Sequence, residues 1–222
     1  MSENIIDLLT KVYQYAPSCA EAAAVDAYRT AAIAFCERTR LWRADLTCVA
    51  TTNPVPVVPY TASPLANKIT LPADAELFEF GPMLIDGRKV DPATIAEVDD
   101  FYPNWRTDTS TGTPSLFTQK QDDEIHFVPS FNTVATAAIK ANVILKPTES
   151  ASTIPSAIAA KYRAELAHGA LAIVLSLPGQ SFTNPNLALY FQSQFDAELD
   201  RLFTRSTKGQ QHAPLRSKSK WF

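Results

Sequence analysis

Apolar residues recur at three- and four-residue steps in the last third of the chain. Between Ser152 and Phe203 this spacing predicts two helices, which a turn at Pro178-Gly179 separates. Pro155 has the place of a first-turn proline, and Asn184 before Pro185 is typical of a capped helix start. From Ala170 to Leu177 the pattern is apolar on every side, so we expect burial all round.

The N-terminal segment has a similar spacing. Ser2 is expected to cap a first helix, which ends before Pro17. Ser18 and Glu21 have the spacing of a capping box, which predicts a second helix up to about Arg40. The apolar face of that helix comprises Ala24, Tyr28, Ala31, Phe35 and Trp42.

The periodicity changes from Ala44 onward, where prolines crowd and alternation typical of strands begins. Glu76 to Val90 is predicted to be a hairpin, because Asp86-Gly87 is a strong signal for a tight turn between strands. Ala93 to Val98 is expected to be a short helix. Further strands are predicted at Leu46–Thr51, Lys68–Pro72, Leu116–Lys120, Glu124–Val128 and Ala137–Leu145.

These elements predict an α+β fold in which N- and C-terminal helices form an antiparallel helical bundle, interrupted by a β-rich insertion and followed by an extended C-terminal arm. The expected domain boundaries place the bundle at residues 1–43 and 152–205, the insertion at 44–151 and the arm at 206–222.

The net charge of −3 conceals an asymmetry. From Arg201 to Phe222 there are six basic residues and no acidic one, whereas the preceding part carries 14 basic and 23 acidic residues. Phosphate binding needs a cationic surface, so this balance argues against a body that binds nucleic acid. The basic tail ends in Trp221-Phe222, two aromatic residues suited to anchoring in a partner's groove.

No motif in the sequence indicates catalysis. His126, His168 and His212 lack neighbours at metal-ligand spacing, and the Asp99-Asp100 pair is interpreted as a solvated turn. The three cysteines, Cys19, Cys36 and Cys48, are expected to be reduced thiols. We therefore expect no catalytic, cofactor-binding or metal-binding residues, no enzyme, no signal peptide and no membrane span.

Several short motifs, taken in order, resemble tailed-phage head–tail adaptor (connector) proteins over about residues 12 to 200. The resemblance begins at Tyr15-Ala16-Pro17-Ser18-Cys19 and continues through the helix that ends in Leu41-Trp42-Arg43. The later motifs are Ile69-Thr70-Leu71-Pro72, Ile85-Asp86-Gly87, Pro103-x-Trp105, Gly112-x-Pro114, Ile125 to Pro129, Leu145-Lys146-Pro147-Thr148, Ala167-x-Gly169-Ala170-Leu171, Leu177-Pro178-Gly179 and Asn184-Pro185.

The resemblance implies a structural virion protein at the head–tail junction, assembled in the host cytoplasm. Such adaptors form a ring, expected here to hold about twelve copies, beneath the portal protein. The implied partners are other copies of the chain, the portal protein and a tail tube or nozzle protein, while DNA passes through the channel without specific binding.

Two sets of residues are predicted to carry these contacts. The expected interface with the portal or a neighbouring subunit consists of Arg205, Lys208, Arg216, Lys218, Lys220, Trp221 and Phe222. Packing within the bundle and between subunits is assigned to Tyr28, Phe35, Trp42, Leu166, Ile173, Phe191 and Phe195. The alternative function is another phage tail or baseplate protein whose β insertion binds a ligand.

Overall fold

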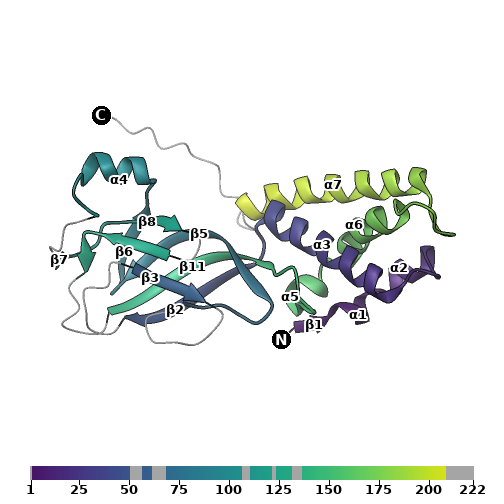
Figure 1. Ribbon diagram of the computed structural model, residues 1–222, viewed down its shortest axis with the longest axis horizontal. Coiled ribbons are helices and arrows are strands. Elements are labelled where there is room, and N and C mark those ends of the chain that lie inside the picture. Colours follow the sequence, from purple (N-terminus) through teal and green to yellow (C-terminus); the bar gives the residue numbers. More distant parts are fainter. Residues whose placement is uncertain are drawn as a thin grey trace. The chain divides into compact units, whose positions relative to one another are not determined.

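The computed structural model of this chain describes residues 2–50, 57–61, 69–106, 111–121, 124–131 and 137–208. The chain divides into two compact units (Figure 1). Unit 1 comprises Met1–Trp42 and Lys146–Phe222, and unit 2 comprises Arg43–Leu145. Unit 1 therefore draws on both ends of the chain, which leaves it after Trp42 and returns at Lys146.

Three long helices of unit 1 pack against one another: α3, α6 and α7. Their buried residues are mostly alanines and leucines on α6, with aromatic rings contributed by α3 and α7. The helices of unit 1 are α1 (Ile5–Leu8), α2 (Thr10–Tyr15), α3 (Glu21–Thr39), α5 (Ser156–Ala159), α6 (Arg163–Leu175) and α7 (Pro185–Lys208).

Unit 1 also contains a two-stranded antiparallel sheet, which the sequence pattern does not predict. Strand β1 (Ser2–Asn4) pairs with β12 (Thr153–Pro155), with Glu3 opposite Ile154. The predicted Ser2 cap is therefore wrong. Asn4 caps α1 instead, since its side-chain oxygen accepts a hydrogen bond from the Ile6 amide at 3.1 Å.

The pairing with β1 also shortens the first helix predicted after Ser152. Pro155 closes β12 and precedes α5, and a break at residues 160–162 separates α5 from α6. The backbone groups of residues 153–155 thus bond to a strand about 150 positions away, a partner that local periodicity cannot reveal.

The predicted turn at Pro178-Gly179 and the predicted helix start at Asn184-Pro185 are both confirmed between α6 and α7. Gly179 has a positive φ of 75°, a conformation that glycine adopts without steric cost. The Asn184 side chain accepts a hydrogen bond from the Leu187 amide at 3.1 Å, and Pro185 is the first residue of α7. α7 reaches Lys208, three residues beyond the predicted boundary at Arg205.

The predicted capping box at the start of α3 is wrong. The residue before α3 is Ala20, which makes no side-chain cap bond. The Ser18 hydroxyl lies 2.8 Å from the hydroxyl of Ser181, in the turn between α6 and α7, and so ties two loops together. A capping box does form at α4 (Ile95–Phe101) in unit 2, between Thr94 and Glu97.

Unit 2 is built on one eight-stranded mixed sheet with the order β2-β11-β5-β6-β8-β9-β3-β4. Antiparallel pairs dominate, but β6–β8 and β3–β4 run parallel. Its strands are β2 (Arg43–Ala50), β3 (Val57–Thr61), β4 (Ile69–Thr70), β5 (Ala75–Ile85), β6 (Arg88–Pro92), β8 (Leu116–Gln121), β9 (Glu124–Val128) and β11 (Ala137–Pro147). A separate parallel pair joins β7 (Thr111–Gly112) to β10 (Ser130–Phe131).

The predicted hairpin is confirmed in β5 and β6. Ile85 lies opposite Arg88, and the two turn residues Asp86 and Gly87 have φ angles of 49° and 80°. Positive φ at both central positions is the geometry of a type I′ turn, which matches the twist of the flanking strands.

The predicted fold class is wrong in its arrangement of helices. The structure is a mixed α+β fold with one large sheet and, among the described residues, seven helices interspersed with the strands. α4 follows β6 within the strand-rich unit, and β1 and β12 pair within the helical one, so N- and C-terminal helices that form an antiparallel bundle around a β-rich insertion do not describe the arrangement. Of the predicted extended arm, residues 206–208 are helical and residues 209–222 lie outside the described part of the chain.

Candidate interaction surfaces

Most of the residues predicted to pack the helices lie inside unit 1. The buried ones are Tyr28, Phe35, Trp42, Leu166, Phe191 and Phe195. Ile173 is only half-buried, because its side chain lines a surface groove between α6 and α7. These positions account for packing within one chain, and their role between subunits stays a prediction.

Gly169 lies where α6 meets both other long helices. A β-carbon at this position would lie 2.8 Å from Cβ of Ala31 on α3 and 2.9 Å from Cζ of Phe195 on α7. Real Cβ atoms do not approach other atoms so closely, so only a glycine fits between the two neighbours. The absence of a side chain at Gly169 therefore allows α6 to pack closely against α3 and α7 at this point.

His168 stacks on Phe191, with ring centroids 5.4 Å apart. Its Nδ1 atom is buried and has no hydrogen-bond partner among the described residues. Burial lowers the pKa of the imidazole below its ordinary value of 6.5, and the nearby Lys11 charge adds to the effect. The site favours a neutral ring that packs against an aromatic neighbour.

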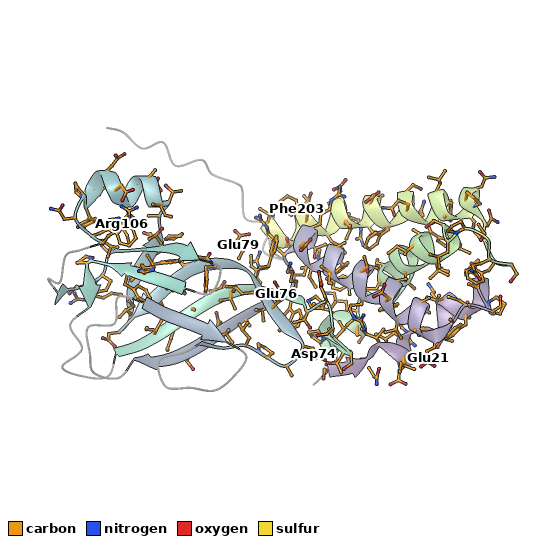
Figure 2. The ribbon with its side chains drawn as sticks, in the orientation of Figure 1. Glu21, Asp74, Glu76, Glu79, Arg106 and Phe203 are labelled. Atoms are coloured by element: carbon orange, nitrogen blue, oxygen red, sulfur yellow. The ribbon has the colours of Figure 1, made fainter. Side chains whose placement is uncertain are left out.

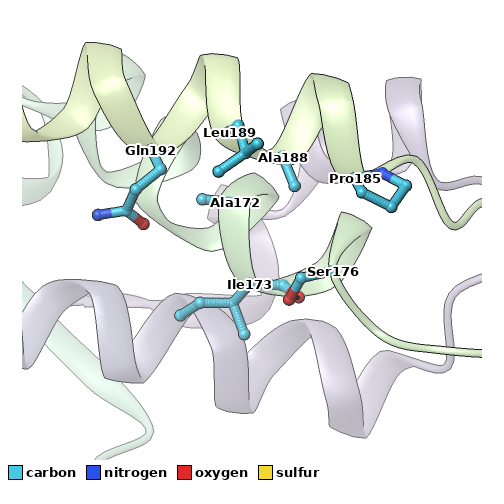
Figure 3. A pocket seen from close by; sticks show the side chains of 7 residues that line it. All are labelled: Ala172, Ile173, Ser176, Pro185, Ala188, Leu189 and Gln192. Atoms are coloured by element: carbon cyan, nitrogen blue, oxygen red, sulfur yellow. Dashed lines mark hydrogen bonds between the residues drawn. The ribbon is translucent and has the colours of Figure 1, made fainter.

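A groove of about 440 Å³ runs between α6 and α7 (Figure 3). α6 contributes Ala172, Ile173 and Ser176, and α7 contributes Pro185, Ala188, Leu189 and Gln192. The Leu189 side chain is prominent here, because 69% of its surface remains exposed. An apolar residue so exposed beside a hollow is a candidate contact surface.

Along α7, the surface beyond the groove carries charge. Gln192 donates a hydrogen bond to Asp196 at 3.0 Å, one turn further on. Asp196 and Asp200 both pair with Arg38 of α3, at 3.2 and 2.8 Å. One arginine thus bridges two carboxylates, which leaves this cluster with one net negative charge.

Of the predicted tail interface, only Arg205 and Lys208 belong to the described part of the chain. Arg205 is exposed on α7, and Lys208 is the last residue of that helix. The exposed Phe203 lies close by near the same end of α7 (Figure 2). Arg216, Lys218, Lys220, Trp221 and Phe222 lie outside the described residues, so their role as an interface stays a prediction.

A second candidate surface lies at α4 in unit 2, where sequence reasoning expected only a solvated turn. Asp99 accepts two hydrogen bonds from the Arg106 guanidinium, at 2.5 and 3.0 Å, and one from Trp105 Nε1 at 2.7 Å. Hydrogen bonds from Arg106 and then Trp105 lower the pKa of the Asp99 carboxyl below its ordinary value. Arg106, labelled in Figure 2, also lies over the Trp105 ring, 4.8 Å from its centroid.

The same α4 segment exposes Phe101, with 72% of its surface accessible, and part of Tyr102. Aromatic and arginine side chains of this kind are enriched in protein contact sites. The signal that could have pointed to this cluster is the Pro103-x-Trp105 motif, but only the fold brings Trp105 and Arg106 back onto Asp99.

Two buried titratable side chains, Tyr28 and Cys36, lie outside these surfaces, in the core of unit 1. Burial raises the pKa of the Cys36 thiol to about 12 and also raises that of the Tyr28 hydroxyl. Cys19 and Cys36 are both free thiols, while the Cys48 side chain lies outside the described part. Within the described ranges no three His, Cys, Asp or Glu side chains converge as metal ligands, and no helix has the length and apolarity to cross a membrane.

A comparison with known protein families shows to which family the chain belongs. Residues 4–218 match the family model described as SU10 adaptor protein. The chain belongs to this family. The match extends well past the region of resemblance found in the motifs and reaches into the basic tail. No curated protein matches the chain.

Membership makes this SU10-family chain a structural adaptor of phages and a component of the virion, with partners in head–tail assembly. An adaptor acts by contact, so the surfaces that matter are those that expose apolar or charged side chains to other proteins. In the described residues these are the α6–α7 groove, the charged cluster on α7 and the aromatic residues at α4.

Proposed function

We propose that this adaptor forms a ring of about twelve copies beneath the portal protein and joins the DNA-filled head to the tail. The observation that carries the proposal is the match to the SU10 adaptor family over residues 4–218. DNA passes through the central channel of this ring, and a tail tube or nozzle protein binds on the side away from the portal.

The distribution of charge supports a channel that does not bind DNA. Unit 2 carries 13 acidic and 7 basic residues, while unit 1 carries 10 acidic and 13 basic ones. Negative charge on the protein disfavours phosphate binding, because counterions are then not released from the DNA. A strand-rich unit with this charge suits a surface past which DNA slides.

The C-terminal residues are proposed to contact the portal or the neighbouring subunit. This segment combines Arg216, Lys218 and Lys220 with the terminal Trp221-Phe222, so it offers both positive charge and aromatic anchors. Trp, Tyr and Arg are the side chains that most often dominate the binding energy of protein interfaces.

Electron microscopy of the purified protein with its portal tests the ring. We expect a closed ring of about a dozen copies bound to one face of the portal. A protein that stays monomeric with the portal and is absent from virions would contradict the proposal. Mass spectrometry of tail-less heads distinguishes the alternative, because an adaptor remains on such heads and a tail or baseplate protein does not.

Deletion of residues 209–222 tests the C-terminal contact. Because α7 continues to Lys208, this truncation leaves the described helix complete. We expect unchanged secondary structure but weaker attachment to the portal or the ring neighbour. A matched control replaces Gln210 and Gln211 with alanine and keeps the basic residues and aromatic pair. Equal attachment of the truncated protein would refute the role of the tail.

A further inference from the structure

The groove between α6 and α7 presents an apolar surface that no side chain of the described chain fills. Its two polar side chains already have partners: the Ser176 hydroxyl donates to the Ile173 carbonyl at 2.7 Å, and Gln192 donates to Asp196. The remaining lining is alanine, isoleucine, proline and leucine (Figure 3). An occupant that gains binding energy here must therefore be apolar.

The chain itself supplies such an occupant. Residues 209–222 follow directly on α7 and end in Trp221-Phe222, the two largest apolar side chains of that segment. Fourteen extended residues span up to about 48 Å. Leu189 lies 19 residues before Lys208 on the same helix, or about 28 Å along its axis. The end of the tail can therefore reach the groove of its own chain with length to spare.

Charge along the route favours the same arrangement. A segment that returns along α7 from Lys208 passes Asp200 and then Asp196 before it reaches Gln192 and the groove. These two carboxylates share the single cation of Arg38, so a further positive charge beside them is favourable. When Trp221 occupies the groove and the tail is extended, Lys218 precedes Trp221 by about 10 Å. This distance places Lys218 beside the cluster of Asp196 and Asp200.

We propose that, before assembly, Trp221 and Phe222 dock into the α6–α7 groove of their own chain. Covalent connection makes this contact intramolecular, with an effective concentration on the order of millimolar, so a modest apolar contact suffices. Docking covers the exposed Leu189 and holds the basic tail along α7. Release of the tail then exposes the groove and the aromatic anchors at the same time.

The test is fluorine NMR of the full-length protein labelled with 5-fluorotryptophan. The chain has three tryptophans, Trp42, Trp105 and Trp221, and the variant Trp221→Phe assigns the third resonance. We expect the Trp221 resonance to be displaced from that of a free peptide of residues 209–222 and to stay displaced on dilution. Leu189→Ser should move it to the free-peptide position.

Tyr190→Ser is the matched control, because Tyr190 is the next residue, is also exposed and does not line the groove. It should leave the Trp221 resonance displaced. A wild-type resonance at the free-peptide position, or one that Leu189→Ser does not move, would overturn the proposal. A displacement lost on dilution would overturn it too, because the occupant would then be a second copy. A negative result in this NMR experiment would not contradict the proposed ring, because electron microscopy with the portal tests ring formation separately.

Discussion

Gly169 on α6 and Ala31 on α3 stand so close that a β-carbon on Gly169 would lie 2.8 Å from the methyl carbon of Ala31. The two residues are 138 positions apart in the chain. Their contact brings the backbone of α6 directly against a side chain of α3, while Phe195 of α7 closes the other side. The three helices can therefore pack in this way only because residue 169 is a glycine, which has no side chain.

We expect Gly169→Ala to destabilise the protein. In an exposed part of a helix this change would stabilise the helix by about 1 kcal/mol, because alanine is a better helix former than glycine. Here the added methyl collides with two neighbours, and overpacking costs about 1–3 kcal/mol, so a net loss of up to about 2 kcal/mol should result. Urea unfolding measures it.

Adding Ala31→Gly provides the control for this prediction. The second change removes one of the two colliding groups, so the double variant should lose less than the sum of the single losses. Strict additivity, or a stabilised Gly169→Ala protein, would show that the helices are not in contact at this residue.

The start of α7 depends on the Asn184 side chain, which accepts the Leu187 amide. Asn184→Ala should cost about 1 kcal/mol of unfolding free energy, because that amide loses its partner. Asn186→Ala is the matched control: it removes the same side chain two positions later, at an exposed site inside the helix. The two variants should differ in thermal stability, and equal melting temperatures would contradict the capping role.

His168 should make stability depend on pH near neutrality. Its folded-state pKa lies below the ordinary value of 6.5, so the unfolded chain binds a proton first as pH falls. The stability that the neutral ring contributes is complete above pH 6.5 and is lost as pH falls through the folded-state pKa. Unfolding measured from about pH 7.5 to 5 in wild type and His168→Gln should show a steeper fall for wild type. Parallel curves would mean that His168 does not titrate in this way.

Arg38 joins α3 to α7 through Asp196 and Asp200. Arg38→Gln should cost about 0.5–1 kcal/mol, because these groups are partly exposed and the two carboxylates, one helical turn apart, then repel each other. The loss should shrink in about 1 M salt, where screening is strong. Arg201→Gln is the control, since Arg201 pairs with Glu198 within α7 alone and should matter less. A loss that salt does not change would argue against an electrostatic origin.

Several local features could be predicted because short stretches encode them. Asp86-Gly87 adopts positive φ at both turn positions, and Asn184-Pro185 starts a helix, since each depends only on the conformational preferences of adjacent residues. The apolar run from Ala170 to Leu177 is buried only in part: Ala170–Ala172, Val174 and Leu175 are buried, but Ile173 is half-buried and Ser176 is exposed, because these two residues line the groove. The motifs that resemble head–tail adaptors are local in the same sense, and the family match agrees with them.

Other features depended on partners far away in the chain, which no local pattern specifies. Ser18 has the spacing of a helix cap, yet its hydroxyl bonds to Ser181, and Ser2–Asn4 form a strand because residues 153–155 lie beside them. The groove beside Leu189 likewise arises only where α6 and α7 meet. The cluster at Asp99 is local by comparison, since Arg106 is seven residues away, but it depends on the turn after α4 that brings the two side chains together. The sequence by itself determined, through apolar spacing and through turn and cap residues, where the long helices and the β5–β6 turn form. Tertiary contacts decided which segments pair, since a hydrogen bond or a close approach such as Gly169 on Ala31 needs both partners in place.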